Sequence, residues 1–241
     1  MTSTGNGTHD TGARDDFAGV VFDLDGVLTD TEHLWEENWV GYSGRFGQPW
    51  DASHTQAMMG MSMPETARYL AEHTDSGEPP AEIAIALTDW MIEALGSGRA
   101  EMAPGATELV VAVAERAPIA LASSAPRRMI DAVLDSTGLS IYFTATVSSE
   151  EVPRGKPSPD VYLEATRRLH REPARCLAVE DSTNGIRSAT GAGLSVVAIP
   201  NRLYPPRQEI LDRCVAVASS LGDVQRELVG RLAGPVGERR R

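Results

Sequence analysis

Three short apolar runs of this sequence end in acidic or hydroxyl side chains or are directly followed by them. They are Asp23 and Asp25, Ser123 and Ser124, and Glu180 and Asp181. Carboxylates that meet in one crevice repel one another, and a hard divalent cation such as Mg²⁺ offsets that repulsion. Beside such a cation, one carboxylate can attack phosphorus while a second moves protons. These residue types therefore predict a magnesium-dependent phosphoryl-transfer site, provided that the fold brings the three groups together.

The chain contains a single lysine, Lys156, among its 22 basic residues. A compact ammonium on a flexible stem offers a point charge that the planar guanidinium of arginine does not supply. Together with the hydroxyl of Ser123, Lys156 would neutralise and orient a phosphoryl group. Composition alone supports equally well the alternative that this one lysine remains by chance and has no role in a site.

Short apolar runs alternate with stretches whose apolar residues recur at helical spacing. Buried strands are expected at 19–24, 119–123, 176–180 and 194–199, and helices at 104–116, 125–137, 158–170 and 183–191. This alternation predicts an α/β fold with a doubly wound, Rossmann-like parallel sheet that is covered on both faces. In such a sheet the ligand crevice lies at the carboxyl ends of the strands, where the acidic and hydroxyl side chains stand.

Residues 31–103 interrupt the alternation after the first strand. Their pattern is that of consecutive helices, at 32–46, 64–73 and 80–95, with no convincing strand. We therefore expect a core domain of residues 17–30 and 104–232 that carries an all-helical cap at 31–103. Residues 1–16 are nearly free of apolar side chains and residues 233–241 end in three arginines, so both are expected to be solvated, disordered tails.

The chain has 34 acidic and 22 basic residues and a formal net charge of −12. A protein this acidic is on average repelled by phosphate backbones and anionic lipid, so neither nucleic acid nor a membrane is expected as a partner. No apolar run approaches the roughly 18 residues that a membrane span needs, and the first residues do not resemble an export or transit signal. A cytoplasmic protein is expected, and the sequence leaves open whether it is a monomer or a homodimer.

The run VFDLDGVLTDTE, with the later SS, GKPSPD and VEDS, resembles the haloacid dehalogenase superfamily of phosphohydrolases, in the branch with a helical cap after the first strand. The resemblance extends from Val20 to about Ile199, with the four motifs in the order of the family. It implies that Asp23 is the nucleophile that becomes phosphorylated. It also implies that Asp25 protonates the leaving group and later activates water.

The same resemblance implies the other site residues. Those assigned to Mg²⁺ are Asp23, Asp181, the main-chain carbonyl of Asp25 and, in or next to the coordination sphere, Glu180. Those assigned to the phosphoryl group are Ser123, Lys156 and backbone N–H groups near Leu24 and Ser124. The Ser124 side chain, Asn184 and Gly185 are interpreted as structural. The implied substrate is a small phosphorylated metabolite.

Hexose phosphomutases of the same branch are a close alternative. They hold the second phosphate of their substrate with a lysine just before a cap glycine and an arginine three residues after it. Here Met59 and Met63 stand at those places around Gly60. A thioether cannot replace a cation opposite a phosphate dianion, so a phosphatase is favoured over a β-phosphoglucomutase-like enzyme unless another cap arginine supplies the charge.

A phosphorylatable, receiver-like signalling module is the alternative that is not an enzyme. Receivers also combine an acidic metal pocket, an aspartate, a hydroxyl and a lysine. They run to about half this length, however, and have neither the helical insertion nor the second acid two residues after the first.

The methionines and tryptophans of residues 31–103 have two interpretations. The methionines at 58, 59, 61 and 63 line an adaptable, apolar part of the lid, or they pack within the cap. The tryptophans are expected to pack rather than to bind, and Trp35 and Trp39 lie one helical turn apart on one face.

Overall fold

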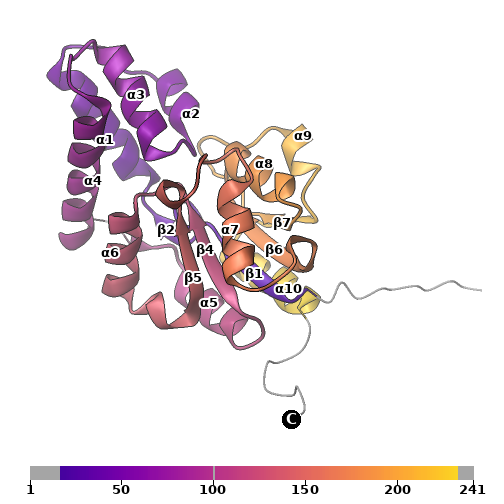
Figure 1. The fold of residues 1–241 in the computed structure, drawn as a ribbon. Coiled ribbons are helices and arrows are strands. Elements are labelled where there is room, and N and C mark those ends of the chain that lie inside the picture. The colour runs from indigo at the N-terminus through magenta and orange to yellow at the C-terminus, as the bar shows by residue number, and fades with distance from the viewer. Residues whose placement is uncertain (1–16, 100, 233–241) are drawn as a thin grey trace, which may run out of the picture.

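Six parallel strands form the central sheet of the computed structural model, which describes residues 17–99 and 101–232. In spatial order they are β5 (Phe143–Ser148), β4 (Ile119–Ser123), β1 (Gly19–Phe22), β6 (Cys176–Glu180), β7 (Ser195–Ala198) and β8 (Ala216–Val217) (Figure 1). The chain first adds strands on one side of β1 and then crosses to its other side with β6. The expected tails, 1–16 and 233–241, lie outside the described residues.

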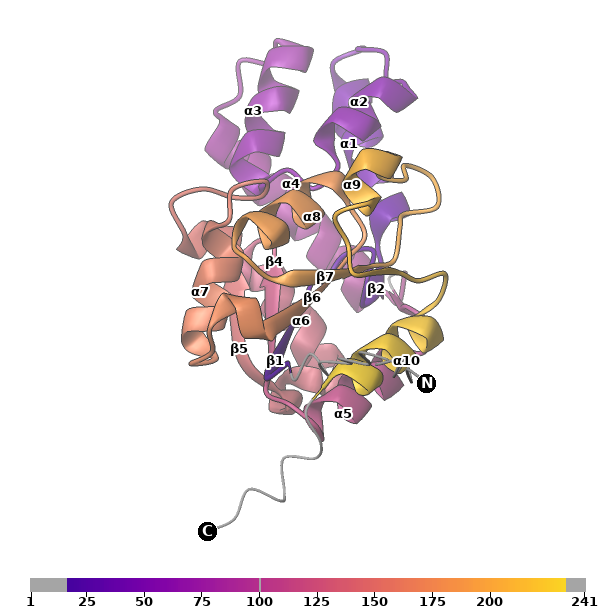
Figure 2. The same ribbon diagram turned by 90° about the vertical axis from the view of Figure 1, so that its right-hand side faces the viewer.

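Alternating side chains of each central strand enter two separate hydrophobic clusters. In β1, Val20 and Phe22 face one cluster and Val21 faces the other, because successive side chains of a strand point to opposite faces. The first cluster is covered by α5 (Ala106–Ala114), α6 (Arg127–Thr137) and α10 (Leu221–Arg231), and the second by α7 (Asp160–Arg168), α8 (Thr183–Gly191) and α9 (Gln208–Leu211) (Figure 2). This confirms the predicted doubly wound, Rossmann-like fold.

Residues 31–99 fold into four helices that stand together above the sheet in Figures 1 and 2. They are α1 (Glu32–Arg45), α2 (Ala52–Met58), α3 (Met63–Thr74) and α4 (Pro80–Gly96). They bury a hydrophobic cluster of their own, with Trp39, Leu70 and Leu87 among its members. At the start of α3, Ser62 and Glu65 form a capping box, in which the Glu65 carboxylate accepts from the N–H of Ser62 at 2.9 Å.

A short antiparallel ribbon joins this helical segment to the sheet. It pairs β2 (Thr29–Asp30) with β3 (Glu101–Met102). The expectation that no strand lies within residues 31–103 was therefore wrong at 101–102. Two residues are too few for the alternation of side chains to be visible in a sequence.

The sequence prediction also omitted several elements: β5, β8, α2, α9, α10 and the 3₁₀ turns η1 (Leu139–Tyr142), η2 (Ser149–Glu151) and η3 (Pro173–Arg175). The strand β5 lies at the edge of the sheet, where side chains such as Phe143 and Thr144 remain partly or fully exposed. Its sequence, FTATVS, therefore lacks the continuous apolar run of a central strand.

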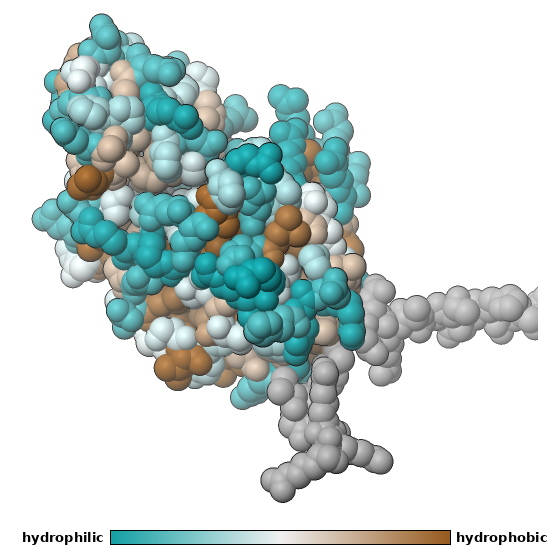
Figure 3. All heavy atoms as spheres, viewed as in Figure 1, coloured by the Kyte–Doolittle hydropathy of each residue, from teal (hydrophilic) through white to brown (hydrophobic). Residues whose placement is uncertain are grey.

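Hydrophilic side chains cover most of the molecular face in Figure 3, with separate hydrophobic spots between them. Across the described ranges, none of the helices combines the length and the apolar character required to cross a membrane.

Replacement of a buried leucine tests the core between the sheet and α5. Leu109 is fully buried, so Leu109→Ala should lower the free energy of unfolding by about 2–5 kcal/mol through lost burial and a residual cavity. Leu203 is 67% exposed, and Leu203→Ala should change it by less than about 0.5 kcal/mol. Urea unfolding followed by circular dichroism measures both, and equal effects would contradict the described packing.

Candidate active site

Three neighbouring strands end at one edge of the sheet and bring together residues that are far apart in the chain. Asp23 directly follows β1, Ser123 ends β4 and Glu180 ends β6. The backbone N–H of Asp23 donates to the carbonyl of Val179 at 3.0 Å, which keeps this aspartate in line with β6. Between β1 and β6 the strand order reverses direction, and open α/β sheets bind ligands at such a switch point.

Lys156 bridges two of these strand ends. Its Nζ lies 2.9 Å from Oδ1 of Asp23 and 2.6 Å from Oε1 of Glu180, and the residue is only 2% exposed. Burial by itself would lower the pKa of Lys156, but the two adjoining carboxylates outweigh that effect and raise it. The ammonium is therefore held in its charged form, fixed in position beside Asp23.

Glu180 is fully buried, and two residues that sequence reasoning did not recognise support it. The hydroxyl of Tyr162, on α7, donates to Oε1 of Glu180 at 2.6 Å. Gly185, on α8, lies so close that a β-carbon there would overlap the Glu180 carboxylate. A structural role of Gly185 thus follows from this close approach, because a larger residue would displace the Glu180 carboxylate. Tyr162 has no sequence signal, because its contact with Glu180 depends on the packing of α7 against the sheet.

Carboxylates crowd the same edge. Oxygen atoms of Asp23, Glu180 and Asp181 lie within 4.8 Å of one another, and all three residues are buried. Burial, followed by the charge of Glu180, raises the pKa of Asp23 to about 7, although Lys156 acts in the opposite direction. The pKa of Asp181 is raised well above its usual value, first by burial and then by Glu180. Such a donor set of hard oxygens fits a divalent cation.

A fourth carboxylate, Glu32 at the start of α1, joins this group and was missing from the sequence prediction. It shares a hydrogen bond with Asp181 and accepts another from Asn201. The backbone at Gly26 passes between these carboxylates with a φ of +77°, and a β-carbon there would meet Asp181 and Glu32. Only glycine combines that backbone conformation with so close an approach.

Asp25 faces a different set of partners. Its Oδ1 accepts hydrogen bonds from the Thr31 hydroxyl at 2.5 Å and from Nε1 of Trp35 at 3.3 Å. Burial raises the pKa of Asp25, while these two hydrogen bonds act to lower it. Trp35 therefore contacts a site residue as well as packing, which corrects the expectation that the tryptophans only pack.

Ser123 is buried at the end of β4 and lines the same cleft, and its Oγ accepts from the N–H of Ala125 at 3.0 Å. The next serine has another task. The Ser124 hydroxyl donates to the carbonyl of Gly60 at 3.2 Å, and the Asn184 amide donates to that of Met59 at 3.1 Å. Both bonds join the core to the loop between α2 and α3, in agreement with the structural interpretation of Ser124 and Asn184.

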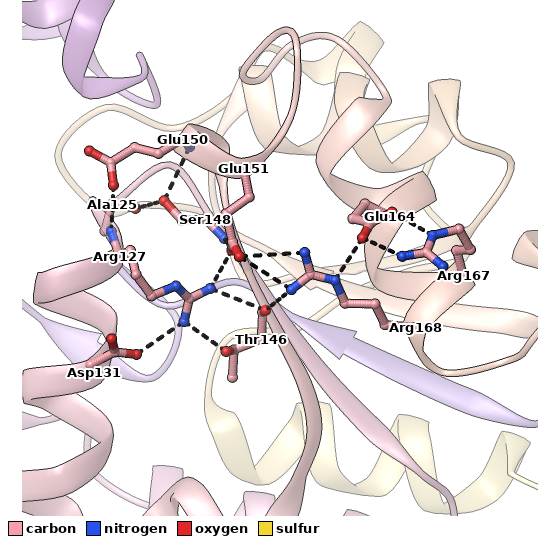
Figure 4. Close-up of polar contacts among 10 residues, drawn as sticks. All are labelled: Ala125, Arg127, Asp131, Thr146, Ser148, Glu150, Glu151, Glu164, Arg167 and Arg168. Carbon is pink, nitrogen blue, oxygen red and sulfur yellow. Dashed lines mark hydrogen bonds and ion pairs between the residues drawn. The ribbon is translucent and has the colours of Figure 1, made fainter.

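A polar network at the β5 edge of the sheet joins the loop after β4 to the loop after β5 (Figure 4). Glu151 lies at its centre, 2.5 Å from Arg127 and 3.4 Å from Arg168, and also accepts from the N–H of Ser148. The Ser148 hydroxyl donates across to a carbonyl of the β4 loop at 2.7 Å. Since the chain after β5 leads into Lys156, this network fixes the lysine relative to β4.

The helices of residues 31–99 line the cleft mainly with apolar side chains. Its described lining includes four methionines and two tryptophans, which are Met58, Met59, Met61, Met63, Trp35 and Trp39. Both interpretations of the methionines hold, because Met58 and Met63 also belong to the buried cluster of the helices. The cap arginines do not line the cleft: Arg45 pairs with Glu78, Arg99 with Glu37, and Arg68 is exposed on α3.

The edge of the sheet thus gathers a lysine-bound aspartate, four further carboxylates and a buried hydroxyl beneath helices of residues 31–99. The family described as haloacid dehalogenase-like hydrolase matches residues 17–193. The chain belongs to this family. It is therefore one of these hydrolases, as the motif resemblance implied.

Similar proteins include several phosphatases. The chain is 30% identical over 214 residues to a bifunctional riboflavin kinase/FMN phosphatase of Arabidopsis thaliana, covering 88% of this chain but only 55% of that relative. It is 32% identical over 222 residues to a probable pseudouridine-5'-phosphatase of Drosophila melanogaster, covering 87% and 92% of the two chains. A crystal structure of CbbY from Rhodobacter sphaeroides in complex with phosphate is similar with a TM-score of 0.76 and 25% identity, over 86% and 96% of the two chains.

Removal of one hydroxyl tests the support of Glu180. Tyr162→Phe deletes a buried hydrogen bond to a carboxylate, so it should lower the free energy of unfolding by about 1.5–3 kcal/mol. The matched control is Tyr142→Phe, because the Tyr142 hydroxyl has no hydrogen bond to the described residues; its effect should stay within about 0.5 kcal/mol. Thermal and urea unfolding measure both, and an unchanged stability of Tyr162→Phe would refute this role.

Proposed function

We propose that this chain is a Mg²⁺-dependent phosphatase that hydrolyses a small phosphate monoester through a phosphorylated Asp23. Membership of the hydrolase family and the phosphatases among the similar proteins support the reaction class. One observation carries the residue assignment: Asp23 contacts the Lys156 ammonium at 2.9 Å, and one of its oxygens lies within 4.8 Å of oxygens of Glu180 and Asp181. No other described group of three or more acidic, histidine or cysteine side chains lies as close together.

In the first step a carboxylate oxygen of Asp23 attacks phosphorus, and the bond between phosphorus and the ester oxygen breaks. Asp25 gives its proton to that departing oxygen, so the alcohol leaves neutral. Burial favours the protonated form of Asp25 before the reaction. Lys156 and Ser123 hold the phosphoryl oxygens while charge moves toward the leaving group.

In the second step Asp25 takes a proton from a water molecule, and the water oxygen attacks phosphorus. The bond to Asp23 breaks, which restores the carboxylate and releases inorganic phosphate. Asp23, Asp181 and the carbonyl of Asp25 would hold the cation, with Glu180 beside it. When bound there, Mg²⁺ supplies positive charge against the carboxylates and the phosphoryl oxygens.

The residues 31–103 would act as a cap on the core of residues 17–30 and 104–232. The β2–β3 ribbon places both crossings of the chain side by side, which suits a hinge. Hydrogen bonds from Ser124 and Asn184 to the cap loop support a closed arrangement that excludes water during phosphoryl transfer.

The alternatives have less support. A β-phosphoglucomutase-like enzyme needs a cation for a second phosphate, and in the described lining of the cleft the cap contributes no cation. A receiver-like module is disfavoured by the hydrolase family match and by the second acid, Asp25. We further propose a small phosphorylated metabolite as the substrate and a cytoplasmic location.

Loss of the nucleophile is the first test. Asp23→Asn should lower kcat for phosphate release at least roughly 10⁴-fold and should abolish a hydroxylamine-labile phosphoprotein, since the amide cannot form the phosphoryl bond. Asp30→Asn is the matched control, because the Asp30 side chain is 73% exposed, and it should stay within about twofold of the parent. Substantial activity of Asp23→Asn would refute the assignment, and a stable phosphoprotein without phosphate release would favour the signalling module.

Competition between protons and Mg²⁺ is the second test. Without a cation the pKa of Asp23 is about 7, so below that pH a proton must leave before the carboxylate binds the metal. Mg²⁺ affinity should therefore rise with pH through the range around 7, because a proton must leave Asp23 and, since its pKa is raised as well, Asp181. Isothermal titration calorimetry between pH 5.5 and 8.5 measures this. An affinity independent of pH would contradict it, and Asp181→Asn should bind Mg²⁺ more weakly throughout.

A further inference from the structure

The cleft contains very little positive charge. Among the described residues that line it, Lys156 is the one cation, and Asp23 and Glu180 already share that ammonium. In the proposed reaction this ammonium binds the phosphoryl group of the substrate. The remainder of the substrate therefore meets no free cation in the described lining.

Four carboxylates line the same cleft, those of Asp23, Asp25, Glu32 and Asp181. A carboxylate or second phosphate on the substrate would lose water on entering this space and would face like charges without a partner. Desolvating an unpaired charge is costly, and like charges at short range add to that cost. The lining therefore selects against a substrate with a second anionic group.

Hydroxyl-binding groups are also few on the cap side. Across the cleft, the hydroxyl of the core residue Ser124 already donates to the carbonyl of Gly60. Thr66 supplies the one hydroxyl among the described cap residues of the lining. On the cap side, where apolar side chains form most of the lining, a polyol or sugar would meet few groups able to pair with its hydroxyls, which costs affinity.

Aromatic and thioether groups form the rest of the cap side. The Trp35 ring is held at one point by its hydrogen bond to Asp25 and along one face by Trp39, at 6.1 Å between ring centroids and an interplanar angle of 28°. Met59 and Met61 are half-buried and line the same cleft as Trp35. A fixed indole with flexible thioethers around it suits a flat, apolar group.

We infer that the substrate is a phosphate monoester of an alcohol with an uncharged aromatic group, which Trp35, Met59 and Met61 select. This inference rests on the proposed phosphatase function. Met59 and Met61 are specificity-determining residues, since they contact the part of the substrate that does not react.

Three alkyl phosphate esters separate this inference from its alternatives without a large difference in leaving-group chemistry. They are 2-phenylethyl phosphate, glycerol 1-phosphate and 2-phosphoglycolate, assayed with Mg²⁺ and the full chain by release of inorganic phosphate. The kcat/KM for 2-phenylethyl phosphate should exceed that for glycerol 1-phosphate at least about tenfold, and that for 2-phosphoglycolate at least about 100-fold.

A charge placed in the lining tests the cause. Met59→Lys puts a cation into the cleft, so the ratio of kcat/KM for 2-phosphoglycolate over 2-phenylethyl phosphate should rise at least about tenfold. Ile85→Lys is the control, because Ile85 is 56% exposed on α4 and does not line the cleft; its ratio should match the parent.

The outcomes distinguish the two proposals. Release of phosphate from none of the three esters would refute the phosphatase function, and the substrate inference with it. Release that is fastest from glycerol 1-phosphate or 2-phosphoglycolate would leave the phosphatase standing and overturn the inference. A preference for the aromatic ester supports both, and this comparison holds for the parent chain even where Met59→Lys does not fold.

Discussion

A buried ammonium shared by two carboxylates is the constraint on which the rest of this structure depends. Lys156 joins the ends of β1 and β6 through Asp23 and Glu180, and the group has almost no contact with solvent. Buried charges are costly unless they are paired and hydrogen-bonded on every side. The fold meets that condition by packing Tyr162 and Gly185 against Glu180, so the identities of residues on two helices follow from one ion pair.

The ion pair leaves an excess of negative charge, and that excess defines the chemistry. One lysine cannot neutralise the carboxylates at the strand ends, and burial pushes the pKa values of Asp23 and Asp181 upward. The site is therefore suited to a cation and to an incoming phosphoryl group. Asp25 is set apart from this cluster by Thr31 and Trp35, which gives the two neighbouring aspartates different environments and hence different proposed tasks.

The sequence was sufficient for features with a strong local signal. Continuous apolar runs located the four central strands, and the motifs located Asp23, Ser123, Lys156 and Glu180. Edge strands and two-residue strands lack such a signal, so β5, β8 and the β2–β3 ribbon were missed. Glu32 and Tyr162 enter the site from helices through tertiary packing, which no spacing within the chain reveals. The same holds for Trp35, whose indole reaches Asp25 although its helical position indicated only packing.

The most direct test of the account is a crystal structure of the full chain grown with Mg²⁺ and orthovanadate, a mimic of the phosphoryl group in transfer. The account predicts vanadium bonded to a carboxylate oxygen of Asp23, with Lys156 Nζ and Ser123 Oγ in hydrogen-bond contact with vanadate oxygens and Mg²⁺ between Asp23 and Asp181. Vanadate bound away from Asp23, or an ammonium of Lys156 that contacts neither Asp23 nor the anion, would contradict it.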